Sequence, residues 1–231
     1  MIGVLLVWIG LAFSGAVSDG AEAFQEGDLV RATELWSSTL DSGQASGRVL
    51  FNLGNAWYRR GEHARAVACY RAAQRIRPRD GDIHHNLALA RTELQAVPPA
   101  VASTWVWMAL LTPGELSVLG LLAMAGGSAL AVRWRRLRRR ATRWAAVVGV
   151  CLGAFLGALA WLGHQSPAVA VVVDQEALVR DAPSADAGER HRLPVGAEVS
   201  VLRPAGEFRL IEDGRGRRGW VPSNAVFSPR P

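Results

Sequence analysis

The residues best suited to chemistry in this 231-residue chain gather in one short segment. His84 and His85 follow Asp80 and Asp82, and acids beside imidazoles could transfer protons or bind zinc. Adjacent residues, however, point to different sides of a helix, and no third ligand has the spacing of a zinc site. Both acids are also typical helix-start residues. We therefore predict a helix N-terminus here and no metal site.

No other catalytic pattern occurs in the sequence. It contains no glycine-rich phosphate loop, no nucleophile elbow and no paired acids facing a histidine. Its two cysteines, Cys69 and Cys151, fall in segments of different character, so we predict neither a disulfide nor a cysteine metal site. The expectation is a protein that is not an enzyme and needs no cofactor.

The net charge of +6 comes from a single segment. Residues 19–100 contain ten arginines and ten acidic residues, and residues 165–231 contain nine of each. Residues 133–143 hold seven arginines and no acid, and Glu115 is the only other charge. Each polar segment is thus neutral, which argues against a nucleic-acid-binding domain with a basic face.

Residues 19–96 repeat themselves with a period of 34 residues. Equivalent positions of two successive units hold Phe24 and Tyr58, Gly27 and Gly61, Ala32 and Ala66, and Trp36 and Tyr70. The second unit resembles the tetratricopeptide (TPR) repeat, whose signature positions hold Leu53, Gly54, Trp57, Gly61, Ala66, Tyr70, Ala73 and Pro78. Asp82–Gln95 follows as an amphipathic helix that would cap the stack. We predict an α-helical TPR solenoid at residues 19–96.

The TPR resemblance also suggests a binding groove, because such stacks bind peptide segments along the first helix of each unit. By analogy, the groove-facing positions are Arg48, Asn52, Asn55, Arg59 and Asn86. The functional hypothesis is that these side chains grip the backbone or a carboxylate of a partner protein. The alternative is that they form solvated helix surface.

Two apolar segments flank the arginine-rich one, with Glu115 as their only charge, and each is long enough to cross a bilayer as a helix. We predict transmembrane helices at 113–132 and 144–163, joined by a cytoplasmic turn at 133–143. Arginine clusters stay in the cytoplasm, so the topology signal comprises Arg133, Arg135, Arg136, Arg138, Arg139, Arg140 and Arg143. This predicts a bacterial inner-membrane protein with the lipid bilayer as a partner and both terminal domains in the periplasm.

Small residues recur every four positions in both predicted spans and allow close helix packing. These are Ala123, Gly127 and Ala131 in the first and Gly149, Gly153 and Gly157 in the second. They would pack the spans on each other or on a partner membrane protein. Before the repeats, residues 1–18 read as a signal peptide or an uncleaved N-terminal anchor. Residues 97–112 read as a linker and interfacial segment.

In residues 164–231, short runs of alternating apolar and polar residues are separated by turn residues. This pattern predicts a small all-β domain. Five strands are expected at 168–173, 177–180, 198–202, 207–211 and 219–221. The segment resembles the bacterial SH3-like barrel in Val179-Arg180 with Ala182-Pro183, Leu193-Pro194 with Gly196, and Gly219-Trp220-Val221-Pro222. Trp220 is expected to fill one end of the barrel. The ligand of this domain stays open between cell-wall peptidoglycan and protein.

The predicted fold class is therefore a multi-domain membrane protein with a TPR solenoid, a two-helix transmembrane hairpin and an SH3-like barrel. This domain order, with the stretch Asn86–Arg91 after the full repeat, resembles the BatE proteins of the Bacteroides aerotolerance (Bat) group. The resemblance implies a membrane-tethered periplasmic scaffold. Its partners would be membrane-anchored von Willebrand factor A proteins, other Bat-group proteins and a MoxR-type ATPase. The alternative is a cell-wall-binding anchor acting through the SH3-like domain.

Overall fold

The computed structural model describes residues 17–43, 46–95, 113–137, 140–164 and 168–229. The chain divides into two compact units, one of residues 1–100 with 167–231 and one of residues 101–166. The expected linker at 97–112 and most of the expected signal peptide or anchor at 1–18 lie outside the described residues.

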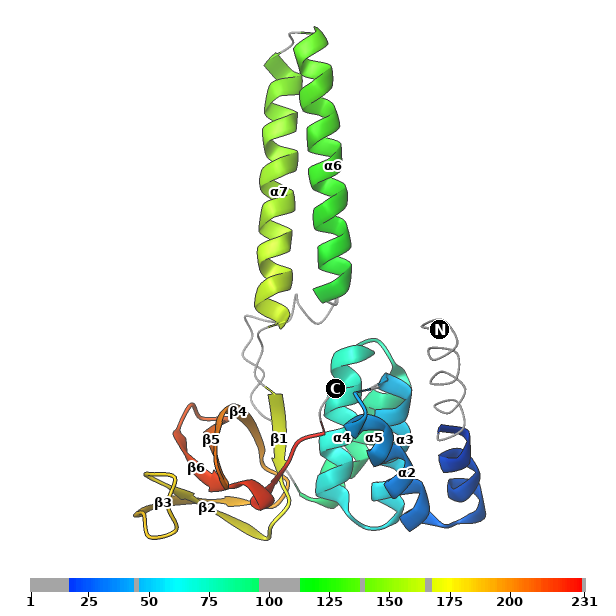
Figure 1. Ribbon diagram of the computed structural model, residues 1–231, viewed down its shortest axis with the longest axis vertical. Coiled ribbons are helices and arrows are strands. Elements are labelled where there is room, and N and C mark those ends of the chain that lie inside the picture. Colours follow the sequence, from blue (N-terminus) through cyan, green and yellow to red (C-terminus); the bar gives the residue numbers. More distant parts are fainter. Residues whose placement is uncertain (1–16, 44–45, 96–112, 138–139, 165–167, 230–231) are drawn as a thin grey trace, which may run out of the picture. The chain divides into compact units, whose positions relative to one another are not determined.

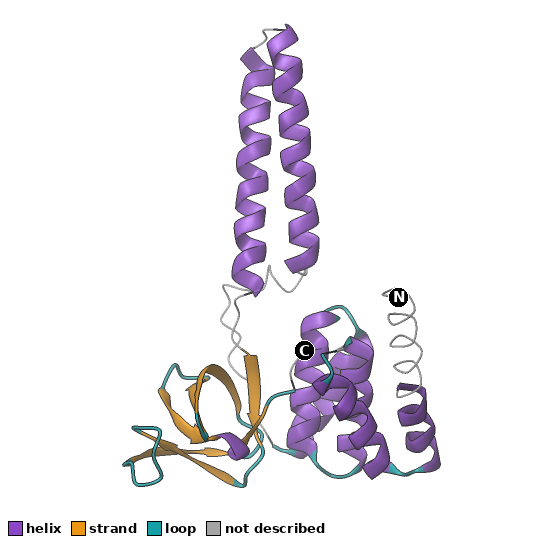
Figure 2. Cartoon of the chain, viewed as in Figure 1, coloured by secondary structure: helices purple, strands orange, loops and turns teal. Residues whose placement is uncertain are grey.

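The N-terminal part of the first unit is a stack of helices (Figures 1 and 2). After a helix at residues 17–26 come α2 (Leu29–Asp41), α3 (Gly47–Arg59), α4 (His63–Ile76) and α5 (Gly81–Glu93). Helix α2 packs on α3, α3 packs on α4, and α4 packs on α5. The expected paired helices, with one further helix after them, are therefore present.

Local signals in the sequence place the ends of these helices. The side chains of Asp28, Ser46 and Asp80 each accept a backbone N–H in the first turn of α2, α3 and α5. Gly27 lies between the helix at 17–26 and α2, and Gly61 lies between α3 and α4. Their φ values are 85° and 78°. Residues with a side chain rarely adopt this conformation, so glycine at both repeat positions permits the short turn.

Gly54 allows α3 and α4 to approach closely. A Cβ atom added at this buried position would lie 2.6 Å from Cε1 of the Tyr70 ring. Tyr70 is itself 1 % exposed and belongs to a core shared by all helices of the stack. The absence of a side chain at Gly54 therefore leaves room for the Tyr70 ring where α3 and α4 cross.

Replacing Gly54 with alanine is expected to lower the free energy of unfolding by about 1–2 kcal/mol. Overpacking a tight core costs about 1–3 kcal/mol, and alanine's better helix propensity offsets part of it. Gly81→Ala is the matched control, because a Cβ there meets no atom within 4 Å. Denaturant unfolding of the full chain measures both, and equal stability of the two variants would contradict the prediction.

The second unit is a helical hairpin of α6 (Pro113–Leu137) and α7 (Arg140–His164). Five arginines of the expected turn lie inside these helices, since α6 includes Arg133, Arg135 and Arg136, and α7 includes Arg140 and Arg143. The expected eleven-residue turn at 133–143 is therefore wrong, and residues 138–139 alone separate the helices.

Among the described residues, no helix combines the length and apolar character that crossing a membrane requires. The prediction of spans at 113–132 and 144–163 is therefore wrong, as is the fold class of a membrane protein that included them. Three further predictions were inferred from these spans and are withdrawn with them. They are the inner-membrane location, the periplasmic placement of both terminal domains, and the lipid bilayer as a partner.

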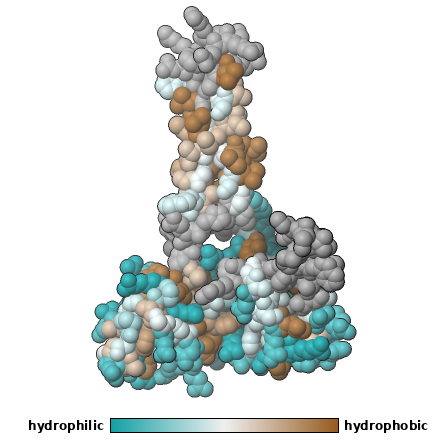
Figure 3. Space-filling model, in the orientation of Figure 1, coloured by the Kyte–Doolittle hydropathy of each residue, from teal (hydrophilic) through white to brown (hydrophobic). Residues whose placement is uncertain are grey.

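Small residues form the contact between α6 and α7. A Cβ added at Gly149 would lie 2.9 Å from Cα of Gly127, and one added at Gly153 would lie 2.7 Å from the carbonyl oxygen of Gly120. Large apolar side chains on both helices instead face outward (Figure 3). Leu121 and Phe155, for example, are 68 % and 60 % exposed. Of the two expected packing modes, the structure thus shows the helices packing on each other.

The C-terminal part of the first unit is a seven-stranded antiparallel sheet in the order β3-β2-β6-β5-β4-β1-β7. Its strands are β1 (Ala168–Val172), β2 (Glu176–Arg180), β3 (Glu189–Pro194), β4 (Glu198–Ala205), β5 (Phe208–Asp213), β6 (Arg218–Pro222) and β7 (Val226–Phe227). Five match the expected strands with small shifts of their ends, and β3 and β7 were not expected. A Cβ at Gly219 would lie 2.2 Å from Val179 Cγ1, so glycine allows β6 to approach β2.

Candidate functional site

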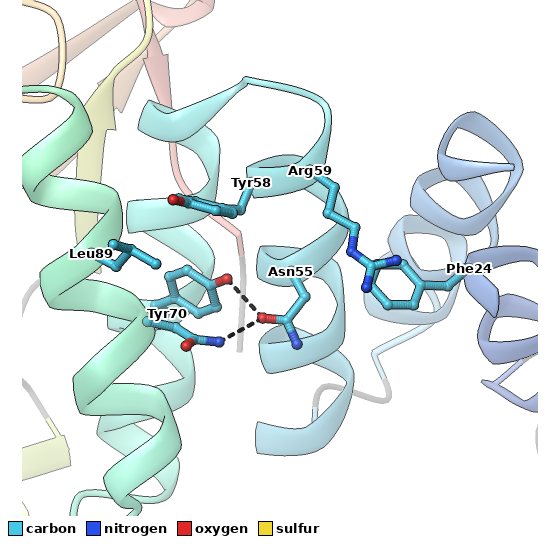
Figure 4. A pocket seen from close by; sticks show the side chains of 7 residues that line it. Phe24, Asn55, Tyr58, Arg59, Tyr70 and Leu89 are labelled. Carbon is cyan, nitrogen blue, oxygen red and sulfur yellow. Dashed lines mark hydrogen bonds between the residues drawn. The ribbon is translucent and has the colours of Figure 1, made fainter. Parts of the chain in front are cut away.

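A pocket of about 290 Å³ opens between the helices of the stack (Figure 4). Its lining comes from the helix at 17–26, from α3, α4 and α5, and consists of Phe24, Asn55, Tyr58, Arg59, Tyr70, Asn86 and Leu89. The repeat explains this arrangement, because Phe24 and Tyr58, like Asn55 and Leu89, are 34 residues apart. Equivalent positions of successive units therefore face one concave surface.

A small hydrogen-bond network fixes the floor of the pocket. Tyr70 donates its hydroxyl to Oδ1 of Asn55 at 2.7 Å, and Nδ2 of Asn86 donates to the same oxygen at 2.9 Å (Figure 4). Burial raises the pKa of the Tyr70 phenol well above its usual value, which keeps this hydroxyl protonated as a donor. The acceptor oxygen of Asn55 is thus occupied twice, and its amide NH2 group has no acceptor among the described residues.

Among the described residues that line the pocket, Arg59 alone carries a charge. Its guanidinium carbon lies 4.2 Å from the centre of the Phe24 ring, so a cation–π contact holds the cation at the rim (Figure 4). Arginine and amide donors beside tyrosine and leucine suit a ligand that offers carbonyl or carboxylate oxygens and apolar side chains.

The five residues expected in the groove divide into two sets. Asn55, Arg59 and Asn86 line the pocket, whereas Arg48 and Asn52 do not. Arg48 is exposed and Asn52 half-buried in the first half of α3, while the pocket opens beside its second half. Their expected role in binding stays a prediction.

Four lining residues were not among those expected: Phe24, Tyr58, Tyr70 and Leu89. The 34-residue period contained a signal for three of them, because Phe24 aligns with Tyr58 and Leu89 aligns with Asn55. Tyr70 carries no such signal, since its position on the second helix of a unit predicts only burial.

The side chains of Asp80 and His84 have structural partners. Asp80 accepts the backbone N–H groups of Asp82 and Ile83 as the N-cap of α5. The ring nitrogens of His84 lie 2.7 Å from the carbonyl oxygen of Pro78 and 3.1 Å from Nε2 of Gln74. In the described part of the chain, no three histidine, cysteine or acidic residues could hold a metal ion together.

Cys69 and the arginine segment do not extend the site. Cys69 is fully buried, and this burial raises the pKa of its thiol far above the usual value, which suppresses the reactive thiolate. Cys151 lies exposed on α7. The topology role proposed for the arginines falls with the spans, and Arg138 and Arg139 lie outside the described residues.

Residues 54–95 match the family model described as the TPR repeat. The match extends from the second half of α3 through α4 and α5, and it contains six of the seven pocket-lining residues. No curated protein matches the chain. TPR repeats present concave surfaces to other proteins, so the match and the pocket together indicate a protein–protein interaction scaffold.

Proposed function

We propose that the chain is an adaptor that holds an extended segment of a partner protein in the pocket between the helix at 17–26, α3 and α5. The observation that carries this proposal is the paired donation to Oδ1 of Asn55, which orients its amide as a fixed donor beside Arg59. A backbone carbonyl or carboxylate would accept from both. Binding, with no catalytic step, is the proposed activity.

The resemblance to BatE proteins supplies candidates for the partner. They are von Willebrand factor A proteins and other Bat-group proteins, and the role would be to assemble an envelope complex. The SH3-like character of the sheet belongs to the same proposal, and it would offer a second contact for such an assembly. The support is the match at residues 54–95 together with the order of the segments in the sequence.

Arg59→Glu is expected to weaken binding of a purified Bat-group von Willebrand factor A protein by about tenfold to a hundredfold. A charge-assisted hydrogen bond contributes roughly 1.5–3 kcal/mol, and the new acid would repel a carboxylate. Isothermal titration calorimetry on the full chain measures the change. Arg31→Glu is the matched control, because it makes the same charge reversal at an exposed position of α2 that does not line the pocket. Equal weakening by both variants would place the binding outside the pocket.

The alternative function, a cell-wall anchor acting through residues 168–229, has less support. Trp220 is 8 % exposed, and the guanidinium of Arg203 lies 5.2 Å from its ring centre, so this aromatic is not free to stack on a ligand. Retention of the full chain by purified peptidoglycan sacculi, undiminished in Arg59→Glu, would favour the anchor over the adaptor.

A further inference from the structure

The helices and the sheet of the first unit share part of one hydrophobic core. Val171 of β1 is fully buried in the same cluster as the helix residues, and Val173, Val195 and Phe227 pack against it. Strand β1 lies against α4 (Figure 1). The sheet therefore contacts the outer helix of the second repeat unit through apolar side chains.

A buried ionic contact lies beside this apolar one. Glu198, the first residue of β4, has a side chain that is only 5 % exposed. Nε of Arg91 on α5 donates to its Oε1 at 2.9 Å, and Nε of Arg71 on α4 lies 2.8 Å from its Oε2. Each carboxylate oxygen thus meets a different arginine, and a carboxylate this buried is tolerated only when it is paired.

The sheet also contacts α3, through a pair of aromatic rings. The rings of Trp57 on α3 and Phe227 on β7 meet edge to face with their centres 6.4 Å apart. The guanidinium of Arg65 lies 4.7 Å from the Trp57 ring centre and 5.8 Å from that of Phe227. Helices α3, α4 and α5 therefore all contribute to the same docking face.

This docking face is separate from the pocket. Its polar and aromatic members on the helices are Trp57, Arg65, Arg71 and Arg91, and none of them lines the pocket. A partner can therefore occupy the pocket while the sheet stays docked.

We propose that the C-terminal sheet is a built-in cap of the helical repeat, held on the α4–α5 side by Glu198 between Arg71 and Arg91. Short repeat arrays expose apolar faces at their ends and are marginal without caps. The sheet covers apolar surface of α3, α4 and α5, holds these three helices together, and leaves the pocket accessible. This inference does not depend on which partner the pocket binds.

Hydrogen–deuterium exchange of the full chain tests the cap. In Glu198→Arg, amides of α4 and β1 are expected to exchange at least about tenfold faster, because three positive charges would then repel one another at the interface. Amides of β2 and β3, which do not contribute to the docking face, are expected to keep their protection and show that the sheet remains folded.

Two further variants keep the test decisive. Glu176→Arg reverses a charge whose partner, Arg192, lies within the sheet, and it is expected to leave α4 unchanged. Combining Glu198→Arg with Arg71→Glu and Arg91→Glu restores opposite charges and is expected to restore protection. If Glu198→Arg fails to fold, Glu198→Gln is compared with Glu176→Gln in the same way. Unchanged exchange of α4 and β1 in a folded Glu198 variant would overturn the cap, as would equal loss in the Glu176 control.

Discussion

Replacing Trp36 with alanine is expected to lower the free energy of unfolding by about 3–5 kcal/mol, because it removes one of the largest buried side chains. Trp36 lies on α2, is 1 % exposed, and its ring centre is 5.8 Å from that of Phe24. Its Nε1 also donates to the carbonyl oxygen of Val17 at 3.4 Å. The substitution would thus leave a cavity between α2 and the helix at 17–26.

The effect should reach the pocket as well as the core. Phe24 packs on Trp36 on one side and carries the guanidinium of Arg59 on the other. Val30→Ala is the control, because Val30 lies on the same helix but is 53 % exposed, and a change within about 0.5 kcal/mol is expected there. Denaturant unfolding measures both variants. A loss below about 1 kcal/mol for Trp36→Ala would show that the first helix pair does not share the core.

The core of the repeat could be predicted from the sequence because its information is local and periodic. Trp36 and Tyr70 are 34 residues apart, and both are 1 % exposed. Gly54 and Gly61 occupy positions where a small side chain or a positive φ is required, so their identity alone indicates the crossing and the turn. The pocket was only half predictable, since Asn55 and Asn86 follow from repeat positions but Tyr70 does not.

The remaining features depend on information that no local pattern carries. Glu198 and Arg91 are 107 residues apart, and each belongs to an ordinary charged segment. Strand β3 contains Glu189, Arg190, His191 and Arg192, and this polar run hides the alternation that predicts a strand. The ends of α6 and α7 were predicted wrongly, because seven clustered arginines suggested a turn. Arginine is also a good helix former, and α6 continues through three of these arginines.

Asp213→Asn is expected to lower the free energy of unfolding by about 1–3 kcal/mol at pH 7 and to flatten its dependence on acid. Asp213 ends β5, and its side chain is 5 % exposed. Its Oδ1 accepts the backbone N–H groups of Arg215 and Arg217 at 2.9 Å, and its Oδ2 accepts Nε of Arg217 at 2.8 Å. An amide retains one oxygen, so part of this network would lose its acceptor.

The pH dependence follows from two groups in this turn. Burial favours the neutral form of Asp213, but the hydrogen bonds from Arg217 and Arg215 outweigh it and hold the pKa of the carboxyl below its usual value. Its stabilising contribution is therefore present above about pH 5 and is lost as the pH falls through the lower folded pKa.

Burial and the charge of Arg217 lower the pKa of His191, whose Nε2 lies 3.5 Å from Oδ2 of Asp213. Its neutral form is favoured on folding, so stability also declines as the pH falls below about 6.5.

Chemical unfolding of the full chain between pH 7 and pH 3 separates these steps. The difference between wild type and Asp213→Asn should shrink as the pH falls below the usual carboxyl pKa and the wild-type carboxyl becomes protonated. His191→Gln should remove only the decline that begins near pH 6.5. Asp181→Asn is the control, since Asp181 pairs with Arg190 at an exposed site and such pairs contribute about 0–1 kcal/mol. A difference between wild type and Asp213→Asn that stays constant with pH would mean that the turn depends on the shape of the side chain and not on its charge.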